Sequence, residues 1–105
     1  MRVLKFGGSS LADGARIGAV TAIAAEAAAG DKTAVVLSAM QGVTDLLIAA
    51  AREAANGPDG GRQALAEIRA RHLAAVRHLF AAPDQPAVIA PLTIMLNELE
   101  EILHG

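Results

Sequence analysis

Two short apolar runs with a helical pattern between them are the feature that most constrains the fold of this chain. Residues 3–6 (VLKF) end at a glycine pair, and residues 33–37 (TAVVL) are β-branched and uncharged, as in short strands buried inside a parallel sheet. Apolar residues recur at helical spacing from Ala15 to Ala29, and Gly30 follows as the expected C′ residue. This order predicts a right-handed βαβ unit with parallel strands near 2–6 and 33–37.

Local signals predict where that first helix and three later ones begin and end. Ser10 to Asp13 resembles a capping box ahead of the first helix. A helix is expected near 44–55, with Thr44 or Asp45 as its cap, and another near 62–81 after the loop NGPDGG. The last is expected near 91–103, with Pro91 at its start.

The last two helices each carry an apolar stripe, and no further strand pattern follows them. The stripes consist of Leu65, Ile68, His72, Val76, Leu79 and Phe80 in one helix and Leu92, Leu96, Leu99 and Leu103 in the other. Two strands do not make an independently stable parallel sheet. We therefore expect the chain to be the opening part of a larger α/β domain.

The composition predicts a thin core. Hydrophobic residues make up 53% of the sequence, but aromatic residues make up only 2%, so alanine and aliphatic side chains must supply the apolar volume. Such a core buries little area per residue. We expect some apolar surface to pack against further parts of the same domain or against a second copy of the chain.

Charge and cysteine usage exclude several classes of partner. The formal net charge is −2 and no basic cluster stands out, which argues against a nucleic acid as the main ligand. The absence of cysteine fits a cytoplasmic protein. The N-terminus lacks the apolar segment of a signal peptide, and no apolar run approaches the roughly 20 residues that span a bilayer, so no membrane partner is expected.

Two small, hydroxyl-bearing loops directly follow the two predicted strands. GGSS at residues 7–10 and SAMQGVT at residues 38–44 should open onto one edge of the sheet, because parallel strands end together. Glycines let backbone N–H groups approach an anion, and a helix N-terminus favours negative charge. Lys5 adds a mobile positive charge suited to a phosphoryl group in transit.

The pattern is not one of the common phosphate-binding motifs, and other candidate sites are weaker. A Walker A loop has its lysine after the glycines, and no G-x-G-x-x-G is present. On the residues alone, a tight strand-to-helix turn beside a solvated lysine is the alternative. His72 is expected to be a packed or hydrogen-bonded core histidine, and His78 and His104 are expected to be surface residues. Glu98, Glu100 and Glu101 of the last helix are expected to form a solvated face. No metal site is therefore predicted.

Both loops lie within stretches that resemble a known family. LKFGGSS (4–10) and VVLSAMQGVTDLL (35–47) closely resemble the two N-terminal motifs of aspartate kinases in the amino acid kinase family, K-F-G-G-[TS]-S and V-V-[LV]-S-A-x-x-x-[VI]-T-[ND]. LNELEEILHG (96–105) also resembles the helical segment before the family's next conserved block. Ser9 replaces the commoner threonine and Asp45 the commoner asparagine. The glycine loops of the acetylglutamate, glutamate and uridylate kinases differ from this one.

The resemblance implies a function and a role for each matching residue. It implies phosphoryl transfer from ATP, with Mg²⁺ held through the phosphates, to the side-chain carboxylate of L-aspartate, giving 4-phospho-L-aspartate for lysine, threonine and methionine synthesis. Lys5 matches the lysine that stabilises the transferred phosphoryl group, and Gly7, Gly8 and Ser9 match the loop that contacts the ATP phosphates. The second motif implies aspartate-binding positions at Ser38, Ala39 and Thr44.

The family's kinase domains run to well over twice this length. The resemblance therefore implies that residues 1–105 are the N-terminal part of a three-layer α/β/α amino acid kinase fold. The substrate-binding arginine, the nucleotide-base pocket and the regulatory ACT domains would lie in further chain, which some members fuse to homoserine dehydrogenase. The chain alone is expected to be inactive. The alternatives are a non-catalytic fragment or paralogue that binds phosphate weakly, and another amino acid kinase.

Overall fold

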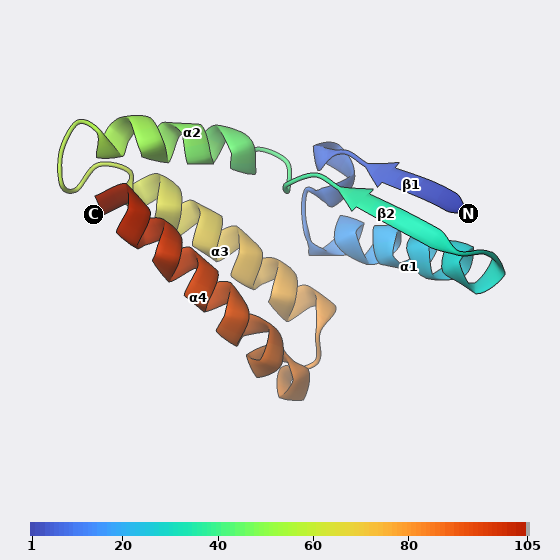
Figure 1. Ribbon diagram of the computed structural model, residues 1–105. Helices are drawn as coiled ribbons and strands as arrows, with labels where there is room; N and C mark the ends of the chain where they lie inside the picture. Colours follow the sequence, from blue (N-terminus) through green and yellow to red (C-terminus); the bar gives the residue numbers. More distant parts are fainter. Residues whose placement is uncertain (105) are drawn as a thin grey trace.

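The computed structural model describes residues 1–104 and confirms the α/β class, with a parallel two-stranded sheet and four α-helices (Figure 1). In chain order, the elements are β1 (Arg2–Phe6), the 3₁₀ helix η1 (Gly8–Leu11), α1 (Gly14–Gly30), β2 (Thr33–Leu37), α2 (Val43–Ala54), α3 (Arg62–Leu79), the 3₁₀ helix η2 (Ala82–Asp84) and α4 (Gln85–His104). The βαβ unit occupies one end of the molecule and the three later helices the other (Figure 1).

The two strands have the bounds that the sequence predicts. They pair in parallel, with Arg2 opposite Thr33 and Phe6 opposite Leu37. Helix α1 runs along one face of the pair (Figure 1). Because the register is even along both strands, β1 and β2 end at the same edge of the sheet, and the two glycine-containing loops start there.

The first helix is capped by a different residue from the one predicted. Asp13, not Ser10, is the N-cap, and its carboxylate accepts a 2.9 Å hydrogen bond from the Arg16 N–H. Ser10 instead lies in η1. The expected C′ residue, Gly30, is the last helical residue, and Asp31 is the C-cap. Asp13 prevails because an aspartate directly before the helix can reach the free N–H groups of its first turn.

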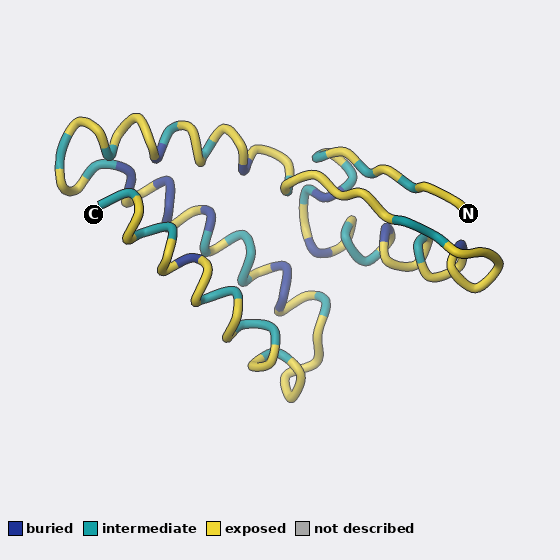
Figure 2. The backbone as a smooth tube through the Cα atoms, viewed as in Figure 1, coloured by how far each residue is buried: buried dark blue, intermediate teal, exposed yellow. Residues whose placement is uncertain are grey.

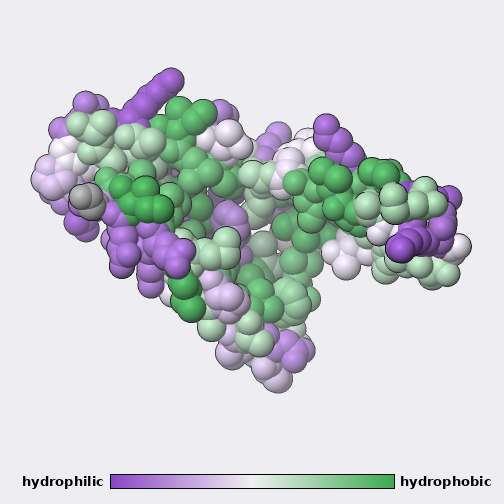
Figure 3. Space-filling view, viewed as in Figure 1, coloured by the Kyte–Doolittle hydropathy of each residue, from purple (hydrophilic) through white to green (hydrophobic). Residues whose placement is uncertain are grey.

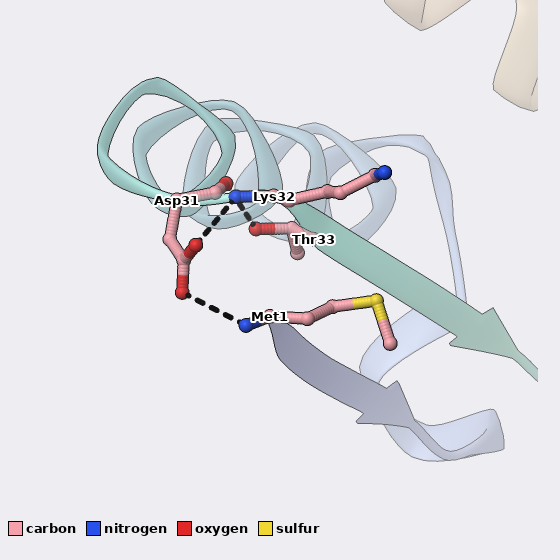
Figure 4. Close-up of polar contacts among 4 residues, drawn as sticks. All are labelled: Met1, Asp31, Lys32 and Thr33. Carbon is pink, nitrogen blue, oxygen red and sulfur yellow. Dashed lines mark hydrogen bonds and ion pairs between the residues drawn. The ribbon is translucent and has the colours of Figure 1, made fainter.

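The turn from α1 to β2 is tied together by Asp31 (Figure 4). Its carboxylate accepts a 2.8 Å hydrogen bond from the Lys32 N–H and lies 3.5 Å from the N-terminal ammonium group of Met1. Its backbone carbonyl accepts a 2.9 Å hydrogen bond from the Thr33 hydroxyl. One residue therefore links the end of α1 to the starts of both strands.

Glycines begin α2 and α3. The N-cap of α2 is Gly42, with φ +83°, and neither Thr44 nor Asp45 caps the helix as predicted. The N-cap of α3 is Gly61, with φ +85°, and a Cβ at the preceding Gly60 would overlap the backbone carbonyl of Glu53. The positive φ values favour glycine because a Cβ is strained in that region.

Helix α3 forms the centre of the core. It packs against α1, α2 and α4 (Figure 2). Of its predicted apolar stripe, Leu65, Ile68 and Val76 are buried, whereas Phe80 is exposed. Two further buried residues of α3 are Ala64 and Ala75. His72 is half-buried, with its Nδ1 atom 2.7 Å from the Ile68 carbonyl oxygen, as expected of a hydrogen-bonded core histidine. The helix ends at Leu79 rather than near 81, because Phe80 adopts an extended conformation.

Helix α4 starts earlier than predicted. It begins at Gln85, so that Pro91 lies inside the helix rather than at its start. Pro86, in the first turn, provides the preferred start, since the N–H groups there lack helical acceptors in any case. Of the predicted leucine stripe, Leu96 is buried.

Within residues 1–104, no helix combines the length and the apolar character needed to cross a membrane.

His104 at the end of α4 was expected to lie at the surface, and this prediction is wrong. Its imidazole is half-buried, with Nε2 3.0 Å from the carbonyl oxygen of Gly60 and Nδ1 3.1 Å from that of Glu100. The position one residue before the chain end gave no hint of this contact with the α2–α3 connection. His78 is exposed, as expected.

The molecule is elongated, and its sheet is open. The radius of gyration is 15.9 Å, whereas a compact domain of this length has about 13 Å. The prediction of buried strands is wrong within residues 1–104, because Val3 is 63% exposed and Val36 is 50% exposed. These two side chains lie opposite α1, on a face that no described element covers; Figure 3 shows apolar surface over the strands.

Candidate functional site

The two loops that follow the strands contact each other. A Cβ placed on Gly8 would lie 3.4 Å from the Cα atom of Gln41 and 3.5 Å from both the Ser38 Oγ atom and the Ala39 carbonyl oxygen. The Ser38 N–H also donates a 3.2 Å hydrogen bond to the Phe6 carbonyl oxygen, which extends the strand ladder up to the loops. The structure thus brings the two sequence motifs together at one edge of the sheet.

The first loop presents unpaired backbone donors. Within residues 1–104, the N–H groups of Gly7, Gly8 and Ser9 donate no hydrogen bond, and the Gly7 carbonyl accepts one of 3.1 Å from the Ser10 N–H. These donors lie at the N-terminal end of η1, after an extended Gly7 with φ −83° and ψ 177°. Consecutive free N–H groups at a turn can form an anion-binding concavity.

Gly7 is not needed for the backbone conformation. Its φ of −83° is accessible to any residue, and a Cβ built there meets no atom within 4 Å. Nothing in the described chain therefore requires a glycine at this position. A glycine here would let a group from outside these residues approach the backbone closely.

Lys5 lies one residue before the end of β1, and its side chain is exposed. The strand alternation puts it on the same face as Val3, opposite α1, where Val36 is its partner in the register. None of the ion pairs or side-chain hydrogen bonds within residues 1–104 involves its ammonium group. Lys5 is therefore free to reach a ligand near the loops.

The second loop offers one occupied and one free hydroxyl. The Ser38 hydroxyl donates a 2.6 Å hydrogen bond to the carbonyl oxygen of the adjacent Ala39. Thr44 is exposed in the first turn of α2, and its hydroxyl has no hydrogen bond within the described residues. The structure brings Ser38 and Ala39 against Gly8, while Thr44 lies further along, at the helix that this loop leads into.

Two arginines that the sequence analysis did not single out donate hydrogen bonds to the first loop and to the residue that follows η1. The Arg16 Nη1 atom donates a 3.1 Å hydrogen bond to the Ser9 carbonyl, and the Arg71 Nη2 atom donates one of 3.0 Å to the Ala12 carbonyl. Arg16 is near the loop in sequence, three residues after the Asp13 N-cap. No local signal points to Arg71, since it reaches the loop from a distant helix.

A cavity of about 350 Å³ lies between the start of α1 and α3, with Met40 of the second loop in its wall. It is lined by Ala12, Asp13, Gly14, Ala15, Met40, Arg71, Ala74, Ala75 and His78. Its charged groups come from Asp13 and Arg71, and most of the remaining wall consists of alanines.

The sequence matches the family model described as "Amino acid kinase family" over residues 1–99. No curated protein matches the chain. The family match includes β1, β2 and both loops, so it covers every residue of the candidate site.

Proposed function

Since this chain belongs to the amino acid kinase family, we propose that it is the N-terminal part of an aspartate kinase. The reaction is transfer of the γ-phosphoryl group of ATP to the side-chain carboxylate of L-aspartate. A carboxylate oxygen attacks the γ-phosphorus, the bond from phosphorus to the ADP oxygen breaks, and 4-phospho-L-aspartate and ADP leave. The family gives phosphotransfer; the choice of aspartate rests on the motifs LKFGGSS and VVLSAMQGVTDLL.

In this proposal, the first loop binds the nucleotide. The N–H groups of Gly7, Gly8 and Ser9 donate to ATP phosphate oxygens, and the Lys5 ammonium neutralises charge that builds up on the transferred group. Such pre-arranged donors are the main means by which enzymes accelerate phosphoryl transfer. The observation that carries the proposal is the set of unpaired N–H groups on a glycine loop that touches the second motif.

The second loop binds aspartate. Ser38 and Ala39 contribute from the loop itself, and Thr44 contributes its free hydroxyl from the start of α2. Contact between Gly8 and Ser38 supports this arrangement, because phosphate and acceptor must lie within a few ångströms of each other for in-line attack.

Magnesium enters this proposal with the nucleotide. Within residues 1–104, no group of three or more His, Cys, Asp or Glu residues lies together as a metal site. Mg²⁺ bound to ATP commonly keeps its waters and phosphate ligands and needs few protein ligands. When bound, it supplies charge neutralisation on the phosphates.

The rest of the kinase domain would cover the open sheet. We propose that further chain adds strands to the sheet and a helical layer over the face that carries Val3, Lys5 and Val36. The exposure of the two valines supports this, because a parallel sheet is normally covered on both faces. That layer would supply the base pocket and the remaining aspartate contacts.

The two lysines of the chain provide a test with a matched control. Lys5→Met and Lys32→Met are introduced into the polypeptide of the complete reading frame, and ATP-dependent formation of aspartyl phosphate is measured as the hydroxamate. Both lysines are exposed, but Lys32 lies at the other end of the sheet. We expect Lys5→Met to lower kcat by about 10³-fold, as for other charge-stabilising groups, and Lys32→Met to leave it unchanged. Equal activity of the two variants would exclude the role of Lys5.

The acceptor needs its own experiment. A panel of L-aspartate, L-glutamate, N-acetyl-L-glutamate and UMP distinguishes aspartate kinase from other members of the family. A strong preference for any acceptor other than aspartate would leave the family intact and refute the aspartate assignment. Titration of the 105-residue chain with Mg-ATP, followed by amide shifts at Gly7, Gly8 and Ser9, tests the remaining alternative. Without shifts at these residues, the chain would be a structural remnant.

A further inference from the structure

Arg71 lies against the segments that lead from the two loops into α1 and α2. Its side chain is half-buried on α3, and Nη2 donates its 3.0 Å hydrogen bond to Ala12, 59 residues away in the sequence. Its Nη1 atom lies over Gly42, where it would be 3.3 Å from a Cβ on that residue. Ala12 follows η1 directly, and Gly42 closes the second loop as the N-cap of α2.

One planar group therefore lies against two segments that are far apart in the sequence. Gly8 and Ser38 contact each other at the strand ends, and Arg71 contacts both segments where they pass into α1 and α2. The guanidinium group is planar and holds its N–H donors in a fixed arrangement. One nitrogen can therefore donate a hydrogen bond to one segment while another packs against the second segment. A lysine has a single ammonium group and cannot hold both contacts in that geometry.

Among the other side chains that line the adjacent 350 Å³ cavity, the imidazole of His78 alone can donate a hydrogen bond, and it packs against Gly14 at the start of α1. Its α3 neighbours in the lining, Ala74 and Ala75, have no polar atom in their side chains. Met40 lines the same cavity from the second loop and carries no hydrogen-bond donor in its side chain. If the side chain at position 71 is shortened, the Ala12 carbonyl faces this space without the arginine that now binds it.

We propose that Arg71 is a positioning residue that fixes the two loops relative to each other and so prepares the first loop to bind phosphate. The second part rests on the proposed function. Arg71 acts through backbone: Ala12 lies three residues after Ser9, and Gly42 lies four residues after Ser38. The arginine itself is not proposed to touch the nucleotide.

The test compares Arg71→Met and Arg71→Lys with Arg77→Met in the 105-residue chain. Arg77 lies on the same helix, is exposed, and has no hydrogen bond or ion pair within residues 1–104. Amide hydrogen exchange without ligand is measured at Ser10 and Val43, whose N–H groups donate hydrogen bonds to Gly7 and Met40 within the two segments, with Ile68 and Leu96 as reporters of global opening. The apparent Kd for Mg-ATP is then obtained from the amide shifts of Gly7, Gly8 and Ser9.

We expect Arg71→Met to speed exchange at Ser10 by about tenfold, the effect of losing the charge-assisted hydrogen bond to Ala12. Exchange at Val43 should speed up by a smaller factor, because only the packing of Arg71 against Gly42 is lost there, and exchange at Ile68 and Leu96 should be unchanged. Arg71→Lys should have the same effect as Arg71→Met at Val43 and a smaller one at Ser10, because an ammonium group can retain the single carbonyl contact. The Kd should rise by a similar factor in Arg71→Met. Arg77→Met should match the wild type in each measurement.

Two results would overturn the proposal. One is loop exchange and Kd in Arg71→Met equal to those in Arg77→Met. The other is faster exchange at Ile68 and Leu96 in step with the loops, which would make Arg71 a general stabilising residue; Arg71→Lys decides this if Arg71→Met does not fold. A wild-type chain that does not bind Mg-ATP would refute the phosphate role given to the loops, while exchange in the free chain still decides whether Arg71 fixes them.

Discussion

Gly8 lies against Ser38, with 3.5 Å between a Cβ built on the glycine and the Ser38 Oγ atom. This contact joins the two stretches that resemble aspartate kinase motifs, and it exists because two parallel strands end at one edge of the sheet. In an open parallel sheet, ligands bind beyond this edge. The meeting of the two loops is therefore a consequence of strand topology.

Gly7→Ala separates ligand binding from folding. The backbone of Gly7 is extended and a Cβ there meets no atom, so we expect the free energy of unfolding to change by less than about 0.5 kcal/mol. The methyl group would lie next to the unpaired N–H groups, and the apparent Kd for Mg-ATP should rise about tenfold or more. Thermal unfolding and amide-shift titration measure the two effects.

Gly30→Ala is the matched control for Gly7→Ala. A Cβ at Gly30 also meets no atom within 4 Å, but this residue ends α1 at the far end of the strands. Nucleotide affinity should be unchanged in this variant. If Gly7→Ala bound Mg-ATP as tightly as Gly30→Ala does, the phosphate would not approach the first loop.

The sequence predicted the parts of the fold that depend on short-range pattern. Both strands and the edge where their loops meet follow from apolar runs that end at glycine or serine, because parallel βαβ topology leaves one arrangement for them. Helix starts were less predictable, because several residues compete. Asp13 rather than Ser10 is the N-cap of α1, and Gly42 rather than Thr44 is the N-cap of α2. Tertiary packing decides which of the competing residues adopts the N-cap conformation.

Long-range contacts could not be predicted from the sequence alone. Arg71 meets Ala12 and His104 meets Gly60 only because α3 and α4 pack back onto earlier segments. Val36 is an apolar, β-branched strand residue of the kind that is usually buried, yet it is exposed within residues 1–104. Its side chain predicts a sheet face that other elements cover. Whether that face is covered depends on residues that are distant in the sequence.

Gly14→Ala should destabilise the contact between α1 and α3. A Cβ at Gly14 would lie 2.7 Å from the His78 Cβ atom, which cannot move without its backbone. We expect a loss of about 1–3 kcal/mol in the free energy of unfolding, the usual effect of overpacking. Gly18→Ala on the same helix is the control: its Cβ would make an ordinary 3.5 Å contact with Leu79, and alanine should stabilise the helix by roughly 0.5–1 kcal/mol. Urea unfolding of both variants measures the difference, and equal stabilities would contradict the close packing.

Pro91→Ala should stabilise α4. Pro91 is exposed inside this helix, where it has no N–H to donate to the Ala87 carbonyl. Restoring that donor should raise the free energy of unfolding by about 1–3 kcal/mol. Pro86→Ala, in the first turn, should change it by less than about 0.5 kcal/mol, since N–H groups there have no helical acceptor. If Pro91→Ala gave no more stability than Pro86→Ala, Pro91 would lie in the first turn and α4 would begin later, as the sequence suggested.

Val36→Thr and Val76→Thr test whether the open sheet face is uncovered in the isolated chain. The substitution preserves shape and adds a hydroxyl group. Val76 is 7% exposed in the α3 core, and its replacement should cost about 1–3 kcal/mol. Val36 is 50% exposed, so its replacement should cost less than about 0.5 kcal/mol. Equal costs in chemical unfolding would mean that something covers this face. A cost at Val36 that grows with protein concentration would identify a second copy, whereas a cost found only in a longer polypeptide would identify the proposed remainder of the kinase domain.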